Sequence, residues 1–254
     1  MRYELMRPNQ IREAIDKHWP VVLPLGVLEY HSEHLPVGMD TLAVIRCLEL
    51  LEREMDLVLL PPFYYGAASC AVAPPEGRGS VNVDSQALLP FARQLFMGLL
   101  RVGFRNIHTF IHHQSEDFAS GMPTDLAFRL ASKQVIMEFL EQTKGEGWWG
   151  DNNSANYYTD HGSIDANPFI WIQHHPLMDA KVLTEYPFDH AGEGETSLMM
   201  SLCPDTVDMA LHDKTQWFAE SAAKASRQTG DHGVELILEH LRRVLSATAR
   251  PPSE

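Results

Sequence analysis

Cysteine is scarce in this sequence. The three cysteines, Cys47, Cys70 and Cys203, lie far apart and match neither a CxxC motif nor the spacing of a zinc ribbon. An odd number of cysteines also argues against the disulfide framework that is typical of small secreted proteins. The scarcity of cysteine therefore excludes a disulfide-stapled scaffold and favours a cytoplasmic protein.

Positive charge is also in short supply. The 254 residues include 20 lysines and arginines against 34 aspartates and glutamates, which gives a formal net charge of −14. This balance repels phosphate backbones and anionic membranes, and so argues against nucleic acid as a partner. No apolar run approaches the roughly 20 residues that a membrane helix needs, and no charged-then-apolar leader precedes the first predicted element. We expect a soluble protein that acts on a small molecule.

The apolar residues recur in the alternating rhythm of strands and helices that is typical of α/β proteins. The predicted strands span residues 20–26, 56–66, 106–112 and 168–175. The predicted helices span residues 9–18, 41–54, 88–100, 124–142, 196–203 and 233–246. We predict one domain over residues 1–254, a three-layer α/β/α sandwich with a mostly parallel central sheet. Functional groups then belong at the carboxyl ends of the strands.

One long stretch, residues 143–162, has no periodicity but contains two tryptophans and two tyrosines. Loops of this length inside compact domains are usually functional or disordered, and the aromatic content favours an ordered loop. We expect this loop, including Trp148, to cover the mouth of an active site and bind substrate, either in its own subunit or in a neighbouring one.

The first polar cluster, GVLEYHSEHLPVGMD, occupies residues 26–40 after a predicted strand. If the strand continues to Leu28, Glu29 and His31 point to the same side, because strand side chains alternate with a period of two. A loop then brings in Asp40, whose carboxylate can bridge two cations. Carboxylates and imidazoles are ligands of zinc and manganese. The alternative is that Asp40 caps the following helix and the other polar residues are solvated.

Two further clusters contain histidine. His112 and His113 end the third predicted strand, and we expect one of them to face the cleft; the alternative is a histidine that fills a polar gap in the core. In DHAGEGETS, which begins at residue 189, His190 can act as general acid or base. Glu193 and Glu195 could instead only favour the positive end of a helix, but that alternative does not explain the histidine.

Three segments together resemble the creatininase family: PLGVLEYHSEHLPVGMD, the strand end at His113, and DHAGEGETSLMM, which occur in the family's order. The resemblance implies an α/β/α sandwich with a binuclear metal site, often in a homohexamer. It implies that Glu29, Asp40 and His113 hold one metal, and that His31 and a bridging Asp40 hold the other. It also makes His190 the catalytic histidine, oriented by Asp189 or Glu193.

The sequence departs from creatininase itself at several positions. Creatininase has a tyrosine and a metal-binding glutamate after the strand-end histidine, where this chain has Gln114 and Ser115. Glu195 is the first candidate for the missing ligand, with Glu193 and Glu116 as alternatives. Creatininase also has a tryptophan that packs on creatinine where Tyr186 stands here. The substrate-side loop of residues 73–83 carries Arg78, which could recognise an oxygen of the substrate or simply lie in solvent.

The predicted function is that of a hydrolase with two divalent cations per chain, Zn²⁺ or Mn²⁺ with Fe²⁺ also acceptable, and a small polar, cyclic substrate other than creatinine. The bond cut is a C–N amide bond. A first alternative is a ring-opening hydrolase of a keto-inositol of the 3-dehydro-scyllo-inosose type, which cuts a C–C bond. A second is a catalytically silent, metal-stabilised binding protein. We predict a homo-oligomer, with a hexamer favoured by the resemblance.

Overall fold

The computed structural model describes residues 1–69 and 71–248. Four parallel strands form its central sheet in the order β2-β1-β3-β4. The strands are β1 (Val21–Leu25), β2 (Val58–Leu59), β3 (Ile107–Ile111) and β4 (Ile172–Pro176). The predicted parallel sheet is therefore confirmed, although β2 is far shorter than the predicted strand over residues 56–66. Prolines at positions 61 and 62 have no N–H to donate and end the ladder there.

Seven α-helices flank the sheet among the described residues. They are α1 (Pro8–Asp16), α2 (Met39–Leu51), α3 (Ser85–Val102), α4 (Pro123–Lys144), α5 (Ala180–Glu185), α6 (Glu193–Leu202) and α7 (Arg227–Thr248). The short 3-10 helices are η1 (Tyr3–Leu5), η2 (Trp148–Gly150), η3 (Asn152–Ser154), η4 (Pro168–Ile170), η5 (Pro204–Thr206), η6 (Met209–Leu211) and η7 (Glu220–Lys224). None of the helices in the described part of the chain is long and apolar enough to cross a membrane.

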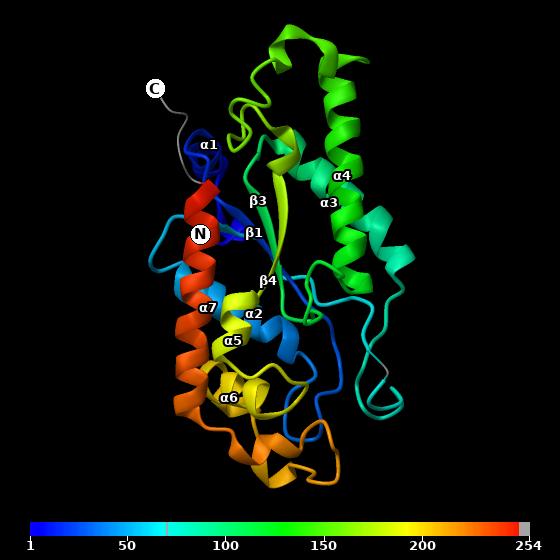
Figure 1. Cartoon of the computed structure of the whole chain (residues 1–254), viewed down its shortest axis with the longest axis vertical. Coiled ribbons are helices and arrows are strands. Elements are labelled where there is room, and N and C mark those ends of the chain that lie inside the picture. The colour runs from blue at the N-terminus through cyan, green and yellow to red at the C-terminus, as the bar shows by residue number, and fades with distance from the viewer. Residues whose placement is uncertain (70, 249–254) are drawn as a thin grey trace.

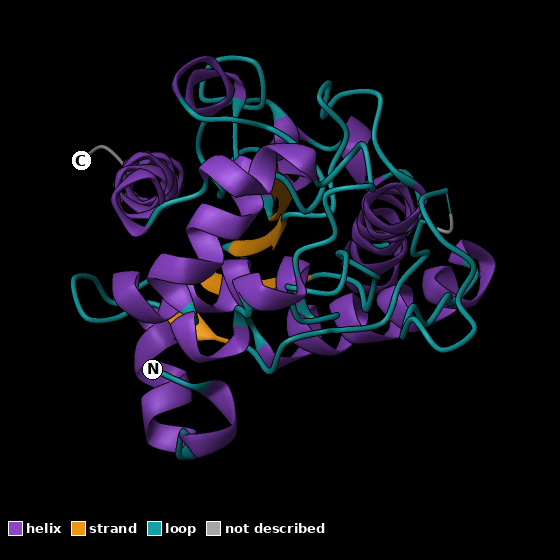
Figure 2. Cartoon of the chain, turned by 90° about the horizontal axis from the view of Figure 1, so that it is seen from below, coloured by secondary structure: helices purple, strands orange, loops and turns teal. Residues whose placement is uncertain are grey.

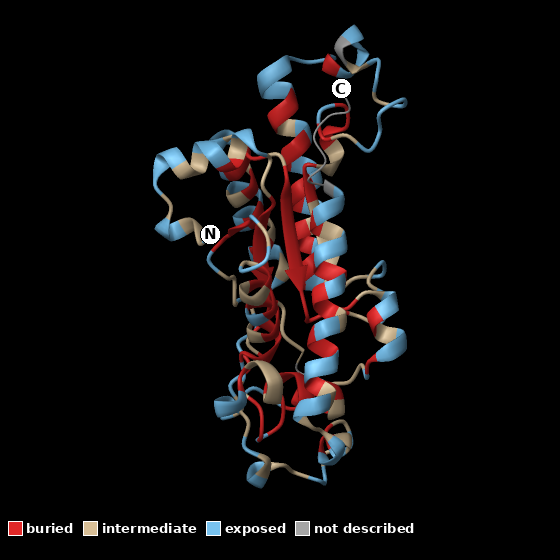
Figure 3. Ribbon diagram, turned by 90° about the vertical axis from the view of Figure 1, so that its left-hand side faces the viewer, coloured by how far each residue is buried: buried red, intermediate tan, exposed pale blue. Residues whose placement is uncertain are grey.

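The helices form a layer on each face of the sheet (Figures 1 and 2), as the predicted three-layer sandwich requires. Val21, Leu23 and Leu25 of β1 pack into one core with α3 and α4, while Val22 packs into the other core with α2, α6 and α7. This division follows from the two-residue period of a strand. The whole of β1 is buried (Figure 3), because a parallel sheet covered on both faces has no solvent side.

The strand order reverses between β1 and β3. The helix that follows β1, α2, covers one face of the sheet, whereas the helix that follows β3, α4, covers the other. The chain therefore leaves the carboxyl ends of these two neighbouring strands in opposite directions, which opens a crevice between them. Ligand sites of open α/β sheets lie at such reversals. The segments that carry Glu29 and His113 begin here.

Helix α6 starts at Glu193, three residues before the predicted helix. The carboxylate of Asp189 accepts hydrogen bonds from the backbone N–H groups of Gly192, Gly194 and Glu195 at 3.2, 2.7 and 3.2 Å. These N–H groups have no partner inside the helix, so the aspartate stabilises the early start. Asp189 thus caps α6, and Glu195 is placed in the first turn of the helix.

Three histidines of β3 and β4 make polar contacts between these two strands, His108 and His175 on one face of the sheet and His174 on the other. His108 Nδ1 lies 2.9 Å from His175 Nε2, and His174 Nδ1 lies 2.8 Å from the hydroxyl of Thr109. Burial lowers the pKa of His108 and of His174 to about 3, and it lowers the pKa of His175 well below its ordinary value. These imidazoles are therefore neutral in the folded protein at physiological pH.

The burial of neutral His108 predicts that the protein loses stability in acid. The folded-state pKa of His108 lies below the unfolded value of about 6.5, so its stabilising effect is complete above that value and is lost as pH falls towards 3. When the pH falls from 7 to 5, the unfolding free energy of the wild type should fall by about 2 kcal/mol more than that of His108→Asn. Urea denaturation at both pH values measures it. The exposed His232→Asn is the control; parallel pH dependences of wild type and His108→Asn would contradict the prediction.

Candidate metal centre

Five predicted metal ligands come together at the crevice between β1 and β3. Glu29 and His31 lie in the loop after β1, Asp40 in the first turn of α2, His113 just after β3, and Glu195 in the first turn of α6. The strand ends at Leu25 and does not continue to Leu28, so the loop rather than the alternation of strand side chains orients Glu29 and His31.

The loop is held in place from two sides. The N–H of Glu29 donates to the carbonyl of Val37, and the N–H of Tyr30 donates to the hydroxyl of Ser80, both at 2.9 Å. Gly26 allows the close approach of α2 to the strand end, since a Cβ at this position would lie only 2.0 Å from Oγ1 of Thr41. This close approach brings the first turn of α2, with Asp40, to the loop that carries Glu29 and His31.

Two groups of three ligand atoms share Asp40. Glu29, Asp40 and His113 form one group, and His31, Asp40 and Glu195 form the other; in each group the atoms lie within 4.8 Å of one another. Asp40 Oδ2 lies 3.7 Å from His113 Nδ1, while Asp40 Oδ1 lies 3.6 Å from His31 Nε2. The two carboxylate oxygens thus face different histidines, as a bridge between two cations requires.

The chemistry of the donor set fits cations. Glu29, Asp40 and Glu195 are 1%, 2% and 6% exposed, and burial of so many carboxylates is costly without positive charge. The nearest charge partners are histidines rather than lysine or arginine. Several donor atoms in the cluster also have no hydrogen-bond partner: Glu29 Oε1, His31 Nε2, Asp40 Oδ2 and His113 Nε2.

The titration of His31 reflects the same concentration of negative charge. Burial alone would lower the pKa of His31, but the carboxylates of Asp40 and Glu195 raise it to about 10. Burial alone would raise the pKa of Asp40, but the charge of His31 brings it below the usual range. The cluster without metal therefore draws in protons, and cations compete with those protons for the same atoms.

The tautomer of His31 suits a ligand. Its Nδ1 lies 3.0 Å from the backbone carbonyl of Glu29, so Nδ1 carries the proton and donates it. Nε2 points to Asp40 and Glu195, and it is the nitrogen that would give up its proton to a bound cation. A carbonyl that accepts from the second ring nitrogen is the usual way in which proteins orient a metal-binding histidine.

His190 lies beside this cluster, on the path to solvent. Its ring stands 4.4 Å from the ring of His31, and its Nε2 donates to the backbone carbonyl of Tyr30 at 3.0 Å. The following residue, Ala191, has a φ of 54°, and Ser32, which follows His31, has a φ of 60°. Left-handed conformations of non-glycine residues cost of order 1 kcal/mol each and concentrate at functional sites.

A cavity of about 550 Å³ opens at the crevice. Its walls include Glu29, Asp40, His113 and Glu195, whereas His31 lies fully buried behind them. The other described lining residues are Ser69, Val72, His112, Gln114, Ser115, Glu116, Met122, Phe188, Asp189, His190, Trp217 and Phe218. The cavity adjoins both groups of ligand atoms and is large enough for a small ring.

Both histidines of the pair after β3 face this cavity, although we expected only one to do so. His113 belongs to the ligand cluster, and His112 Nε2 donates to Glu195 Oε1 at 3.1 Å. The expectation rested on the alternation of strand side chains, but β3 ends at Ile111, so alternation no longer applies. His112 therefore helps to orient Glu195.

Gln114 and Ser115 line the cavity, but both side chains are hydrogen-bonded to the protein backbone. The amide of Gln114 donates to the carbonyl of Met178 at 2.8 Å and accepts from its N–H at 3.1 Å, while the hydroxyl of Ser115 donates to the carbonyl of Asp117. Gln114 thus ties the end of β3 to the segment after β4. These contacts position the wall and leave little of either side chain for a substrate.

Three other predicted site residues lie outside the cavity wall. Tyr186 is 3% exposed in the core, and its hydroxyl donates to the carbonyl of Gly194 at 2.7 Å. Arg78 donates to the hydroxyl of Tyr30 at 2.9 Å. Glu193 is partly buried in the first turn of α6, but only its backbone N–H is engaged, with Ser221. The structure therefore does not bring these three side chains to the cavity.

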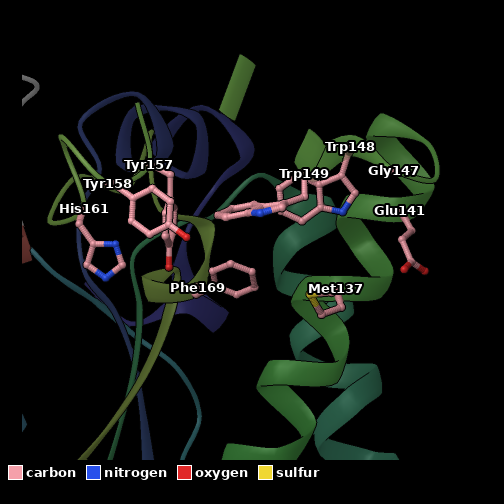
Figure 4. A pocket seen from close by; sticks show the side chains of 9 residues that line it. All are labelled: Met137, Glu141, Gly147, Trp148, Trp149, Tyr157, Tyr158, His161 and Phe169. Atoms are coloured by element: carbon pink, nitrogen blue, oxygen red, sulfur yellow. The ribbon is translucent and has the colours of Figure 1, made fainter. Parts of the chain in front are cut away.

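Trp148 lies at the other end of the molecule. It follows α4, which starts beside the cavity and runs for 22 residues, or about 33 Å, away from it. There Trp148 joins an aromatic cluster with Trp149, Tyr157 and Phe169 (Figure 4). A loop that leads from a helix into a parallel strand must lie at the amino edge of the sheet, so this loop does not cover the cavity of its own subunit.

Comparison with known proteins supports the resemblance. The family model described as "Creatininase: Creatinine amidohydrolase" matches residues 4–243. The chain belongs to the creatininase family. It is accordingly a hydrolase. The family resemblance inferred from the three sequence segments is thus confirmed.

Sequence relatives of this creatininase-family hydrolase differ in their substrates. It is 27% identical to a 3-dehydro-scyllo-inosose hydrolase from Thermotoga maritima over an alignment 283 residues long, which covers 96% of this chain and 82% of the relative. It is 23% identical to a creatinine amidohydrolase from Pseudomonas putida over 191 residues, or 74% of this chain and 66% of the relative.

The fold is also that of solved creatininases. A creatinine amidohydrolase crystal structure superposes with a TM-score of 0.71 at 19% identity, over 98% of both chains. A structure described as "Creatininase Mn" gives a TM-score of 0.72 at 17% identity over 98% of this chain and 99% of that one. Another, a variant described as the "Zn-Zn type", gives 0.72 at 17% identity over 98% of both chains.

Proposed function

We propose that this protein is a metal-dependent hydrolase that opens a small, uncharged ring at a carbonyl carbon. The observation that carries the proposal is the buried cluster of Glu29, His31, Asp40, His113 and Glu195 at the wall of a cavity. Burial of so many carboxylates is costly without cations, and the ligand atoms fall into two groups that share Asp40.

Each of the two ligand groups would bind one cation. Glu29, Asp40 and His113 would hold one divalent cation, and His31, Asp40 and Glu195 would hold the other. Oxygen and imidazole donors suit Zn²⁺, Mn²⁺ and Fe²⁺, and solved relatives described as Zn-Zn and Mn forms support divalent ions. When bound, such a pair lowers the pKa of a water to about 7 and polarises a carbonyl group.

His190 is the proposed proton donor to the leaving atom. Because its Nε2–H is held by the carbonyl of Tyr30, the other nitrogen, Nδ1, is the atom that exchanges a proton with the substrate. Its ring is fixed between His31 and Phe218, at centroid distances of 4.4 and 5.5 Å. The positioning removes the need to order the imidazole during the reaction.

The cavity favours an uncharged substrate. Its described lining residues include the acidic Glu116 and Asp189 in addition to the proposed ligands, but neither lysine nor arginine. Away from the two proposed cations, a carboxylate or phosphate on the substrate would therefore meet negative charge without a cationic side chain to bind it. Arg78, the nearest candidate by sequence, binds Tyr30 instead.

Two bonds remain as candidates for cleavage. The family model supports the C–N bond of a cyclic amide. The relative that aligns with 96% of this chain supports the C–C bond of a keto-inositol ring. Both reactions need addition of water to a carbonyl and protonation of the leaving nitrogen or carbon, which the same side chains can perform.

Metal content and a substrate panel test the proposal together. The purified protein should hold two divalent cations per chain by elemental analysis, and one or none would favour a silent binding protein. Assayed at saturating Zn²⁺ and Mn²⁺, it should open 3-dehydro-scyllo-inosose or a cyclic amide, with little or no turnover of creatinine. Efficient creatinine hydrolysis would contradict our assignment of the pocket. Light scattering tests the proposed homo-oligomer, with a hexamer expected.

A further inference from the structure

The mouth of the cavity carries an aromatic residue that the sequence patterns did not single out. The structure places Tyr186 in the core and Trp148 at the far end of the molecule, so neither supplies an aromatic face to the cavity of its own subunit. Trp217 and Phe218 line the cavity instead. Trp217 is 83% exposed, which is unusual for the largest apolar side chain.

The two residues continue a row of rings that begins at the metal centre. The ring of His31 lies 4.4 Å from that of His190, which lies 5.5 Å from Phe218, which in turn lies 6.0 Å from Trp217. The rings of Phe218 and Trp217 are perpendicular, with an interplanar angle of 89°. The row leads from the proposed proton donor to solvent, so Trp217 stands at the outer end of the path that a substrate takes.

The backbone around Trp217 is firmly anchored. The side-chain amide of Gln216 donates to the hydroxyl of Tyr30 at 3.0 Å, and the N–H of Ala219 donates to the carbonyl of Gln216 at 3.0 Å. The carbonyl of the fully buried Ala219 accepts from His212 at 2.8 Å. An exposed indole on a fixed backbone is a preorganised surface, since little ordering is needed before it makes a contact.

We infer that Trp217 is a specificity-determining residue that stacks on the face of the substrate ring. The inference rests on the proposed function, because it takes from it an uncharged ring opened beside His190. An indole presents a broad apolar face that packs on the CH groups of a cyclitol or on a planar cyclic amide. Since the side chains of Gln114 and Ser115 are hydrogen-bonded within the protein, the aromatic faces of Trp217 and Phe218 are the surfaces best suited to hold an uncharged ring here.

Trp217→Ala should raise KM by roughly tenfold and leave kcat within about twofold, because lost binding that is equal in ground and transition states appears in KM alone. Trp217→Phe should recover most of the loss, since it keeps an aromatic face. The assays use metal-loaded full-length protein with 3-dehydro-scyllo-inosose and a panel of cyclic amides. The control is Trp149→Ala, another exposed tryptophan, at the opposite end of the molecule.

The outcomes separate this inference from the proposed function. Turnover with an unchanged KM in Trp217→Ala overturns the stacking role alone. A change in oligomeric state of Trp217→Ala by light scattering also overturns it, because the indole would then be covered by a second copy of the chain. If the metal-loaded wild type opens no panel compound, the proposed function falls, and the inference falls with it. An equal effect of Trp149→Ala would likewise overturn it.

Discussion

Asparagine in place of Asp40 is expected to abolish metal binding and hydrolysis together. The two oxygens of Asp40 face His113 and His31, one in each ligand group, so this carboxylate is the only residue common to both. A neutral amide offers a single weak oxygen donor and cannot bridge two cations. Elemental analysis should find both cations lost or greatly reduced, and turnover of the best panel substrate should fall to the level of chelator-treated protein.

A matched variant addresses the alternative in which Asp40 only caps a helix. Helix α2 begins before Asp40, and Oδ2 of Asp40 has no hydrogen-bond partner, whereas Asp84 accepts from the N–H of Gln86 at 2.7 Å and does cap α3. Asp84→Asn should therefore keep both cations and full activity. Full metal content in Asp40→Asn would remove the binuclear proposal.

His190→Asn and Glu195→Gln are expected to separate a proton donor from a metal ligand. Replacement of His190 should leave both cations bound and lower kcat by roughly 10²–10⁴, the usual contribution of a general acid, with no rescue by added metal. Replacement of Glu195 should weaken one cation, and activity should partly return at high metal concentration. Metal titrations monitored by rate and by elemental analysis distinguish the two behaviours.

The first turn of α6 offers the control for this pair. Glu193 lies two residues before Glu195 but does not line the cavity, so Glu193→Gln should change neither metal content nor rate by more than about twofold. His190 also forms a group of potential ligand atoms with Glu29 and His31. If His190→Asn loses a cation, the histidine is a ligand and the proton donor must be another residue.

The periodicity of the sequence was enough to predict the architecture. The apolar run of β1, the strand patterns of β3 and β4, and the helical patterns of α1 to α4 predict the parallel sheet and its two helix layers. Their limits were less predictable. The start of α6 depends on the cap by Asp189, and β2 is shorter than predicted because two prolines follow it. Both are local effects of one or two residues.

Loop placement was the main failure of the sequence-based interpretation. The segment of residues 143–162 looked like a lid because of its aromatic residues, yet it joins α4 to β4 and so lies at the amino edge of the sheet, away from the cavity of its own subunit; a role in a neighbouring subunit stays a prediction. Topology alone could have shown this. Tyr186 looked like a substrate contact because it stands where creatininase has a tryptophan that packs on creatinine, but its ring packs in the core near α7, against Gly233.

The sequence by itself determined the chemistry available to this protein, since Glu29, His31, Asp40, His113 and Glu195 are donor types that have few other uses when buried together. Only the tertiary structure decided their geometry: which oxygen of Asp40 faces which histidine, and which side chains surround the substrate. Trp217 shows why. It lies 104 positions after His113 in the chain, and no local pattern encodes contacts that form only when distant segments pack together.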